Sequence, residues 1–212
     1  MTTEQLMAQS TDFMVAEFNA IQQRAVQKEQ SRSTATNLFL IIVAAALAGL
    51  PGILQLVSAA LIPIMLGFVL TFIFTAGCAT LEYSINESVV AILLHRRAGR
   101  IRRWFVEQNP IIEGYVPFEP SDDKPAIYIR DLHFRGTDSV AFIINIASAA
   151  LLASLPLSYI SWPFAVVGAI ITAGATWWTQ NAYTARKLKR AEVEVQHRIK
   201  FPLTKQSNVQ QP

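Results

Sequence analysis

The sequence lacks charged side chains over two long stretches, and this absence is its most informative feature. No Asp, Glu, Lys or Arg occurs from Ser33 to Leu81 or from Ser139 to Ala185. Because a charge at the centre of a bilayer costs about 3 kcal/mol or more, an uncharged apolar run of about 20 residues predicts one membrane crossing. Each stretch is long enough for two. Charged residues make up 16% of the chain, against about 25% in ordinary soluble domains, so the composition excludes a typical soluble fold.

Cysteine and catalytic motifs are also scarce. The single cysteine, Cys78, excludes an intramolecular disulfide, and its apolar setting predicts a small buried side chain. His95, His133 and His197 are isolated along the chain, so no zinc-binding spacing is present. The GxSxG, HExxH, P-loop and dinucleotide-binding motifs are missing. We therefore expect no enzyme, no cofactor and no metal site. The first residues lack a basic region before an apolar core, so we expect no cleavable signal peptide.

Proline and glycine divide each uncharged stretch. Pro51-Gly52 predicts a turn in the first stretch, and the cluster Pro156–Pro163 predicts one in the second. The fold class is therefore predicted to be an all-α membrane protein with four transmembrane helices as two hairpins and with cytoplasmic helical extensions. The predicted crossings lie near residues 38–54, 59–81, 139–157 and 163–178.

The distribution of charge predicts the orientation of the chain. Neither predicted turn carries a charge, so all 18 Lys and Arg residues lie at the other ends of the crossings. The positive-inside rule then places both termini and the central segment in the cytoplasm, at a cell inner membrane. The predicted division is a cytoplasmic N-terminal helix (1–36), a first hairpin (37–81), a cytoplasmic basic helix and loop (82–138), a second hairpin (139–180), and a cytoplasmic basic helix with a disordered tail (181–212).

The most basic segment, HRRAGRIRR, holds five arginines with no acidic residue between Glu87 and Glu107. Beside a membrane, such a cluster typically orients the chain across the bilayer and contacts anionic lipid headgroups. Each basic residue near the surface contributes about 1 kcal/mol to membrane binding. A specific anionic ligand such as a nucleotide or nucleic acid is the alternative, although we expect no direct contact with nucleic acid. The candidate anion contacts are Arg96, Arg97, Arg100, Arg102 and Arg103.

Two further cytoplasmic segments have recognisable patterns. Met14, Phe18, Ile21 and Ala25 form a helical stripe, which predicts packing on neighbouring helices or on a sister subunit, or docking of a partner. Three prolines break the segment after Pro110, where AIYIRDLHF alternates enough to predict a short extended piece. A connection of this kind is typical of a cap over the helices or of a contact loop.

Within the crossings the polar residues are small or uncharged. Ala165, Ala169 and Ala173 recur at four-residue spacing, which predicts close helix approach. Two alternatives stay open for such faces: packing inside one subunit, or a weakly polar pore wall made by several subunits. Carboxylates at the end of the second crossing would favour cations if an oligomer arranged them in a ring, whereas exposed interfacial acids are the plainer interpretation. The possible pore or gate residues are Glu82, Asn86, Glu87 and Asn145.

The segment RIRRWFVEQNP, preceded by EFNAIQQRAVQKEQSR and followed by PFEPSDDKP, resembles a broad group of small prokaryotic membrane proteins. Members of that group combine a cytosolic helix, a hairpin and a basic RIRRYF-type helix. The two-hairpin plan is also similar in architecture to multi-span effectors of bacterial anti-phage systems.

The resemblance implies an oligomeric, pore-forming or depolarising effector, or a membrane subunit of a bacterial defence or stress system, triggered from the cytoplasm. The alternative is a non-conducting anchor or scaffold for a cytosolic partner protein. The expected partners are anionic membrane lipids, further copies of the chain and a cytosolic protein.

Overall fold

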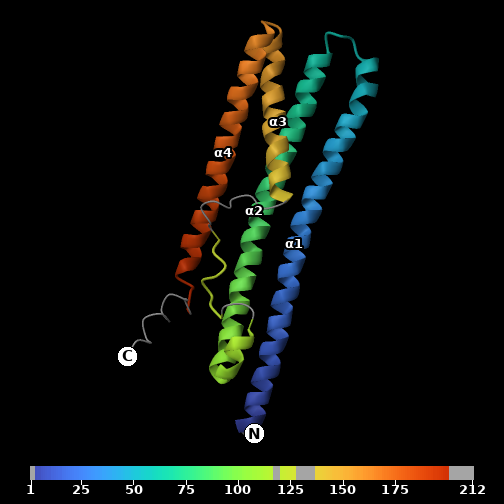
Figure 1. Cartoon of the computed structure of the whole chain (residues 1–212). Coiled ribbons are helices and arrows are strands. Elements are labelled where there is room, and N and C mark those ends of the chain that lie inside the picture. Colours follow the sequence, from blue (N-terminus) through green and yellow to red (C-terminus); the bar gives the residue numbers. More distant parts are fainter. Residues whose placement is uncertain (1–2, 117–119, 128–136, 201–212) are drawn as a thin grey trace. The chain divides into compact units, whose positions relative to one another are not determined.

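The computed structural model describes residues 3–116, 120–127 and 137–200, and helices dominate this part of the chain (Figure 1). No β-strand occurs within these ranges, and the predicted all-α character is confirmed. The elements are α1 (Thr3–Leu56), α2 (Ile62–Gln108), the 3-10 helix η1 (Pro110–Tyr115), α3 (Thr137–Ser158) and α4 (Trp162–Gln196).

Three helices contain a segment long and apolar enough to cross a membrane, as expected of a membrane protein. The helical ranges that contain these segments are Met7–Leu56, Ile62–Gln108 and Ser139–Ser158. α4 is not among them, although it carries no charge before Arg186. Its adjacent tryptophans and several threonines lower its mean hydropathy, because such side chains favour the membrane interface over hydrocarbon.

The prolines that predict the two turns both lie inside helices. Pro51 lies within α1, and the turn to α2 follows at residues 57–61. Pro156 lies within α3, and the turn to α4 is residues 159–161. Proline removes one backbone hydrogen bond, but apolar helices tolerate it where neighbouring groups satisfy the freed carbonyl. The first turn therefore comes later than Pro51-Gly52 predicts, whereas the second falls inside its predicted range.

α4 ends earlier than the predicted basic tail helix. After Gln196 the chain forms a turn, in which the backbone N–H of Arg198 donates to the carbonyl of Val195 at 2.8 Å. Three predictions lie outside the described residues: most of the extended piece in AIYIRDLHF, the position of His133, and the disordered tail after Lys200.

The described residues form two compact units. Unit 1 consists of residues 1–30, 87–129 and 188–212, and unit 2 of residues 31–86 and 130–187, each within the described ranges. The boundaries fall inside α1, α2 and α4, so each of these helices contributes residues to both units. The apolar crossing segments belong mainly to unit 2, whereas the five arginines of HRRAGRIRR belong to unit 1.

In unit 2 the helices pack through small and apolar side chains. Phe39 from α1, Ile73 from α2 and Ala141 from α3 are buried in one cluster. Gly77 permits this approach, because a Cβ atom at its position would overlap the carboxamide of Asn145 and crowd the ring of Phe39. α2 therefore contacts both α1 and α3 at a point where a Cβ atom would force neighbouring side chains to move.

The small-residue face of α4 is also turned toward its own chain. Ala165 is buried, and Ala169 and Ala173 are partly buried. A Cβ atom at Gly168 would overlap the side chain of Leu157 on α3. These contacts are consistent with packing inside one subunit, and the alternative of a pore wall made by several subunits stays a prediction.

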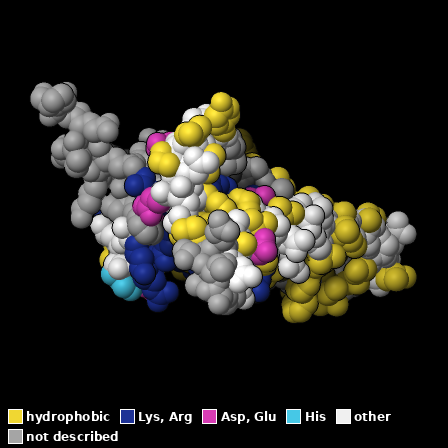
Figure 2. Space-filling model, turned by 90° about the horizontal axis from the view of Figure 1, so that it is seen from below, with side chains coloured by type: hydrophobic (Ala, Val, Ile, Leu, Met, Phe, Trp, Pro, Cys, Tyr) yellow, Lys and Arg dark blue, Asp and Glu magenta, His cyan; other side chains and the backbone are white. Residues whose placement is uncertain are grey.

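The outward surface of unit 2 is formed by large apolar side chains. Phe68, Ile170 and Trp178 are 75%, 67% and 66% exposed. Figure 2 shows hydrophobic side chains gathered over one part of the visible face and Lys and Arg gathered over another. Contiguous apolar surface of this extent is typical of a face covered by lipid.

Candidate anion-binding site in unit 1

The arginine-bearing part of α2 is fixed first by its apolar side, which packs on α1. The stripe predicted on α1 faces this contact, and its packing role is confirmed. Met14, Phe18 and Phe105 pack against the cluster as partly buried side chains. The fully buried members are Ile21, Ala25, Leu94, Ala98 and Ile101.

Arg96 lies deep inside unit 1 and connects three segments. Its side chain is 4% exposed, and Nη2 donates to both carboxylate oxygens of Glu192 on α4 at 2.8 and 3.0 Å. Nε donates to the carbonyl of Pro125 at 3.0 Å, and the N–H of Ile127 donates to the same Glu192 carboxylate at 2.8 Å. Nη1 is buried and has no acceptor among the described residues. Two sides of this guanidinium are therefore satisfied and one is not.

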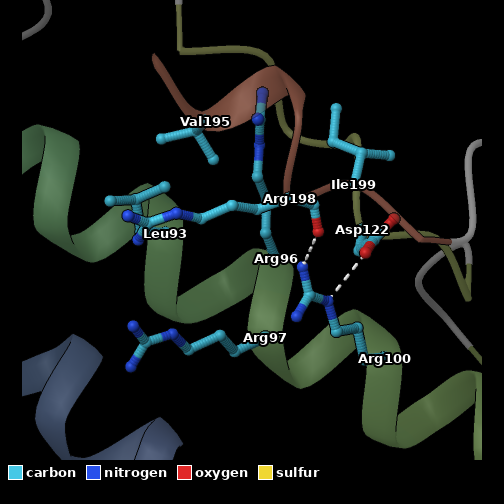
Figure 3. A pocket seen from close by; sticks show the side chains of 8 residues that line it. All are labelled: Leu93, Arg96, Arg97, Arg100, Asp122, Val195, Arg198 and Ile199. Atoms are coloured by element: carbon cyan, nitrogen blue, oxygen red, sulfur yellow. Dashed lines mark hydrogen bonds and ion pairs between the residues drawn. The ribbon is translucent and has the colours of Figure 1, made fainter. Parts of the chain in front are cut away.

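Arg100 makes a second set of contacts one turn further along α2 (Figure 3). Its Nε donates to Oδ2 of Asp122 at 2.7 Å, and its Nη2 donates to the carbonyl of Arg198. The Asp122 side chain is fully buried and also accepts from the N–H of Lys200 at 2.8 Å. The Arg198 carbonyl and the Lys200 N–H both lie beyond the end of α4, so the non-helical backbone there is tied to α2 and to the loop.

Gly99 explains how the loop reaches α2. The carbonyl oxygen of Ser121 lies directly on this glycine, and a Cβ atom at Gly99 would overlap it. Because Ser121 precedes Asp122, the close approach places the carboxylate against Arg100. The glycine that interrupts the basic segment is therefore the position that admits the loop.

The other three predicted anion contacts differ from one another. Arg97 is exposed and makes no ion pair or hydrogen bond among the described residues. Arg102 lies over the ring of Phe18, 5.4 Å from its centroid, and burial lowers the pKa of the Arg102 guanidinium. Arg103 donates to Glu107 at 2.8 Å, four residues along the same helix. Arg97 is therefore the predicted contact that is left without a partner among the described residues.

A small cavity of about 100 Å³ lies among these residues. Arg96, Arg97, Arg100 and Arg198 line it together with Asp122, and Figure 3 shows Arg97 without a contact to the other drawn residues. Arg198, Asp122 and Glu192 were not predicted as site residues, because they are distant in sequence from the arginine cluster. Two sequence features could have pointed to these residues: Gly99, which admits the loop that carries Asp122, and the basic end of α4.

The predicted gate residues of unit 2 near the end of its apolar segments have local partners. Glu82 lies one residue beyond the uncharged stretch and accepts hydrogen bonds from Lys187 at 3.1 Å and from Tyr183 at 3.4 Å. The hydrogen bond and the positive charge of Lys187 hold the pKa of Glu82 below its ordinary value. Asn86 is exposed. Glu82 is therefore already neutralised within one chain.

The remaining gate candidates are buried. Glu87, which belongs to unit 1, pairs with Lys28 at 3.1 Å. Asn145 is fully buried in unit 2, and its Nδ2 donates to the sulfur of Cys78 at 3.8 Å. The amide of Gln180 approaches the same sulfur at 3.9 Å. Asn145 thus faces the interior of one chain rather than its surface.

Comparison of the chain with protein-family models, curated proteins and solved structures found no match. The resemblance to small prokaryotic membrane proteins and to anti-phage effectors therefore stays a prediction. Within the described ranges, no group of three His, Cys, Asp or Glu side chains is arranged to hold a metal ion.

Proposed function

We propose that the chain is a non-enzymatic, multi-pass protein of a cell inner membrane, acting as a non-conducting anchor that presents a cytoplasmic platform to a soluble partner protein. The observation that carries this proposal is the construction of unit 1. There α2 is joined to α4 and to the 120–127 loop by buried ion pairs, and α1 packs on α2 through an apolar cluster. All three helices also contribute to the apolar unit 2. Such an arrangement suits a defined surface attached to a membrane.

Contacts inside unit 1 favour four crossings over three. Arg96 near the end of α2 pairs with Glu192 near the end of α4, so these two segments share one side of a membrane. A chain that leaves α2 and returns to that side through α3 and α4 crosses an even number of times. Because α3 is apolar enough to cross, α4 supplies the return. Ile21 of α1 packs against the end of α2, so these two segments also lie on one side of the membrane, and the chain crosses an even number of times between them.

Charge favours a cytoplasmic position for unit 1. The turns at residues 57–61 and 159–161 carry no charge and lie at the same end of unit 2 (Figure 1). The Lys and Arg residues lie toward the other ends of the helices, which the positive-inside rule places in the cytoplasm. The four crossings then form two hairpins with both termini inside.

The polar side chains of unit 2 support an anchor more than a pore. Asn145, Ser148 and Thr184 are buried within one chain, whereas the outward positions carry large apolar residues. A conducting path requires polar groups or a hydrophobic constriction along an opening. These three buried side chains are used in helix packing within one chain.

Labelling with a membrane-impermeant maleimide tests the topology. In a Cys78→Ala background, we expect Ser58→Cys and Ser158→Cys to react in intact spheroplasts, because each would lie at an outer turn. Lys124→Cys, the matched inner position, should react only after permeabilisation. If Ser158→Cys reacts only after permeabilisation while Ser58→Cys reacts before it, α3 and α4 do not form a crossing hairpin and the four-crossing proposal fails.

An oligomeric membrane-acting effector, in a defence or stress system, is the second candidate. It is favoured by the continuity of α1, α2 and α4 through both units, since unbroken helices would transmit a rearrangement of unit 1. A potential-sensitive dye separates the candidates. An anchor should leave polarisation unchanged and should co-purify with a soluble partner in fixed stoichiometry. Depolarisation on expression, lost on Asn145→Leu with the variant still in the membrane, would favour the effector instead.

A further inference from the structure

We propose that the cavity among α2, the 120–127 loop and the end of α4 binds a phosphate-class anion, held by Arg97 and Arg198 beside the buried guanidinium of Arg96. This inference depends only on unit 1, so it does not rest on the anchor function or on the number of crossings. Residues from three separate segments meet at the cavity (Figure 3).

The charge balance around the cavity is positive. Glu192 compensates Arg96, and Asp122 compensates Arg100. Arg97 and Arg198 have no carboxylate partner among the described residues; the recorded contact of the Arg198 side chain is a long one, 3.5 Å from Nε to Nε2 of His197. Of the four arginines that line the cavity, Arg97 and Arg198 therefore have no counter-charge among the described residues. Arginine is the side chain best suited to binding phosphate oxygens through paired N–H donors.

The unpaired nitrogen of Arg96 is an independent sign of a missing acceptor. Its residue is 3% exposed, and Nη1 is buried without an acceptor in the described part of the chain. Leaving a buried donor unsatisfied costs about 1–3 kcal/mol, and more for a charged group, so native structures rarely leave one. The cavity lies against this residue, so an anion bound there would place negative charge beside a guanidinium whose other side stays paired with Glu192.

The size of the cavity limits what enters it. About 100 Å³ accommodates a single phosphate group but no nucleobase or acyl chain. The rest of a larger ligand would stay outside. The same chemistry would come from a lipid headgroup or from a soluble phosphate compound, and these two sources are separated by experiment.

The test uses the full chain in nanodiscs of zwitterionic phosphatidylcholine. Thermal unfolding is followed during titration with inorganic phosphate, against chloride at equal ionic strength so that general screening cancels. A saturable rise of the unfolding midpoint is expected. Arg97→Gln and Arg198→Gln should each weaken the apparent affinity about tenfold or more, because a hydrogen bond to a charged group contributes about 1.5–3 kcal/mol. Arg103→Gln, which removes the same charge from a surface pair, is the matched control.

A second arm replaces phosphatidylcholine with phosphatidic acid, whose headgroup is a phosphomonoester. Stabilisation by phosphate ions supports a soluble ligand, and stabilisation by phosphatidic acid alone supports a lipid headgroup; both uphold the site if Arg97→Gln and Arg198→Gln abolish them. Absence of saturable stabilisation in both arms overturns the proposal. So does an equal response from Arg103→Gln and Arg97→Gln. Because neither Arg97 nor Arg198 has an ion-pair partner among the described residues, the variants are expected to fold, which circular dichroism verifies.

Discussion

The two units of this chain are held together by opposite means, although the same helices supply both. In unit 1, charged side chains are buried and paired, with Asp122 fully enclosed and Arg96 nearly so. In unit 2, the buried polar groups are uncharged: Asn145 and Gln180 direct amides at the sulfur of Cys78. α2 and α4 therefore change their packing chemistry along their length.

The difference reflects the solvent that each unit is expected to meet. Burying charged groups costs the hydration that they have in the unfolded chain, so buried ion pairs persist where good geometry and several hydrogen bonds offset that cost. Between helices in lipid, small residues and neutral hydrogen bonds give close packing without charge, and each such bond is worth about 0.6–2 kcal/mol. A substitution in unit 1 should therefore reduce stability most when it removes a buried charge. A substitution in unit 2 should reduce stability most when it adds atoms between packed helices.

The largest effect is expected from Glu192→Gln. The change leaves the Arg96 guanidinium buried without its counter-charge while preserving the size of the side chain. Breaking a buried pair costs about 3–5 kcal/mol, and we expect about 3 kcal/mol because Glu192 itself is partly exposed. Hydrogen exchange should rise in the 120–127 loop and at the end of α4, with unit 2 unchanged. Glu107→Gln, in the surface pair with Arg103, should change stability by about 0.5 kcal/mol or less. Equal losses from the two variants would contradict a distinct ion-paired core.

Gly99→Ala should be the next most damaging change in unit 1. Its Cβ atom would overlap the backbone carbonyl of Ser121, which cannot rotate away as a side chain does. Overpacking costs about 1–3 kcal/mol, and displacement of the loop would also pull Asp122 from Arg100. The measurement is the thermal midpoint together with exchange of the Lys200 N–H, which donates to Asp122. Gly114→Ala, where a Cβ atom meets nothing within 4 Å, is the control. A stable Gly99→Ala variant with a protected Lys200 N–H would show that the loop does not depend on this contact.

Gly77→Ala tests the same kind of contact in unit 2. Here the added Cβ atom meets the Asn145 side chain and the ring of Phe39, which can shift, so we expect a smaller loss of about 1 kcal/mol. Gly174→Ala has open space around its Cβ atom and should be neutral or stabilising, since alanine favours a helix over glycine by about 1 kcal/mol. Resistance to unfolding in detergent, measured by reactivity of the Cys78 thiol, reports both. If Gly77→Ala resists unfolding in detergent as well as Gly174→Ala does, the close approach of α2 to α1 and α3 at Gly77 is contradicted.

These contrasts show how far the sequence predicts the structure. The uncharged stretches predict the apolar helices well, because excluding charge from lipid is a constraint on every residue of a segment. The turn predicted at Pro51 lies a few residues too early, because a long apolar helix can contain a proline. α1 continues past Pro51 to Leu56, and the turn follows it.

The candidate site was only partly predictable. The helical spacing of Arg96, Arg100 and Arg103 predicts a common basic face. It does not reveal that Glu192 and Asp122 are the partners, because they are 96 and 22 residues away along the chain. Such pairing is decided by the tertiary packing that brings a loop and a distant helix end to α2. The sequence shows that Gly99 interrupts the basic segment. Its role in admitting the loop follows only from the contact with the Ser121 carbonyl in the structure.

The smallest effect is expected from the exposed pair of Glu82 and Lys187. This ion pair lies in unit 2, so it tests whether charge contributes to stability outside unit 1. Lys187 donates a hydrogen bond to Glu82 and attracts its charge, which lowers the pKa of the carboxyl in the folded state below the ordinary value of 4.5. A depressed folded pKa gives a stabilisation that is complete above the unfolded pKa and is lost as pH falls through the folded pKa. The midpoint difference between wild type and Glu82→Gln should therefore be constant from pH 7 to about pH 5 and vanish at lower pH. Because Glu82 is exposed, the difference should be small and should shrink with added salt. Lys187→Gln should give the same profile, whereas a pH-independent difference would mean that Glu82 acts through its shape and not through its charge.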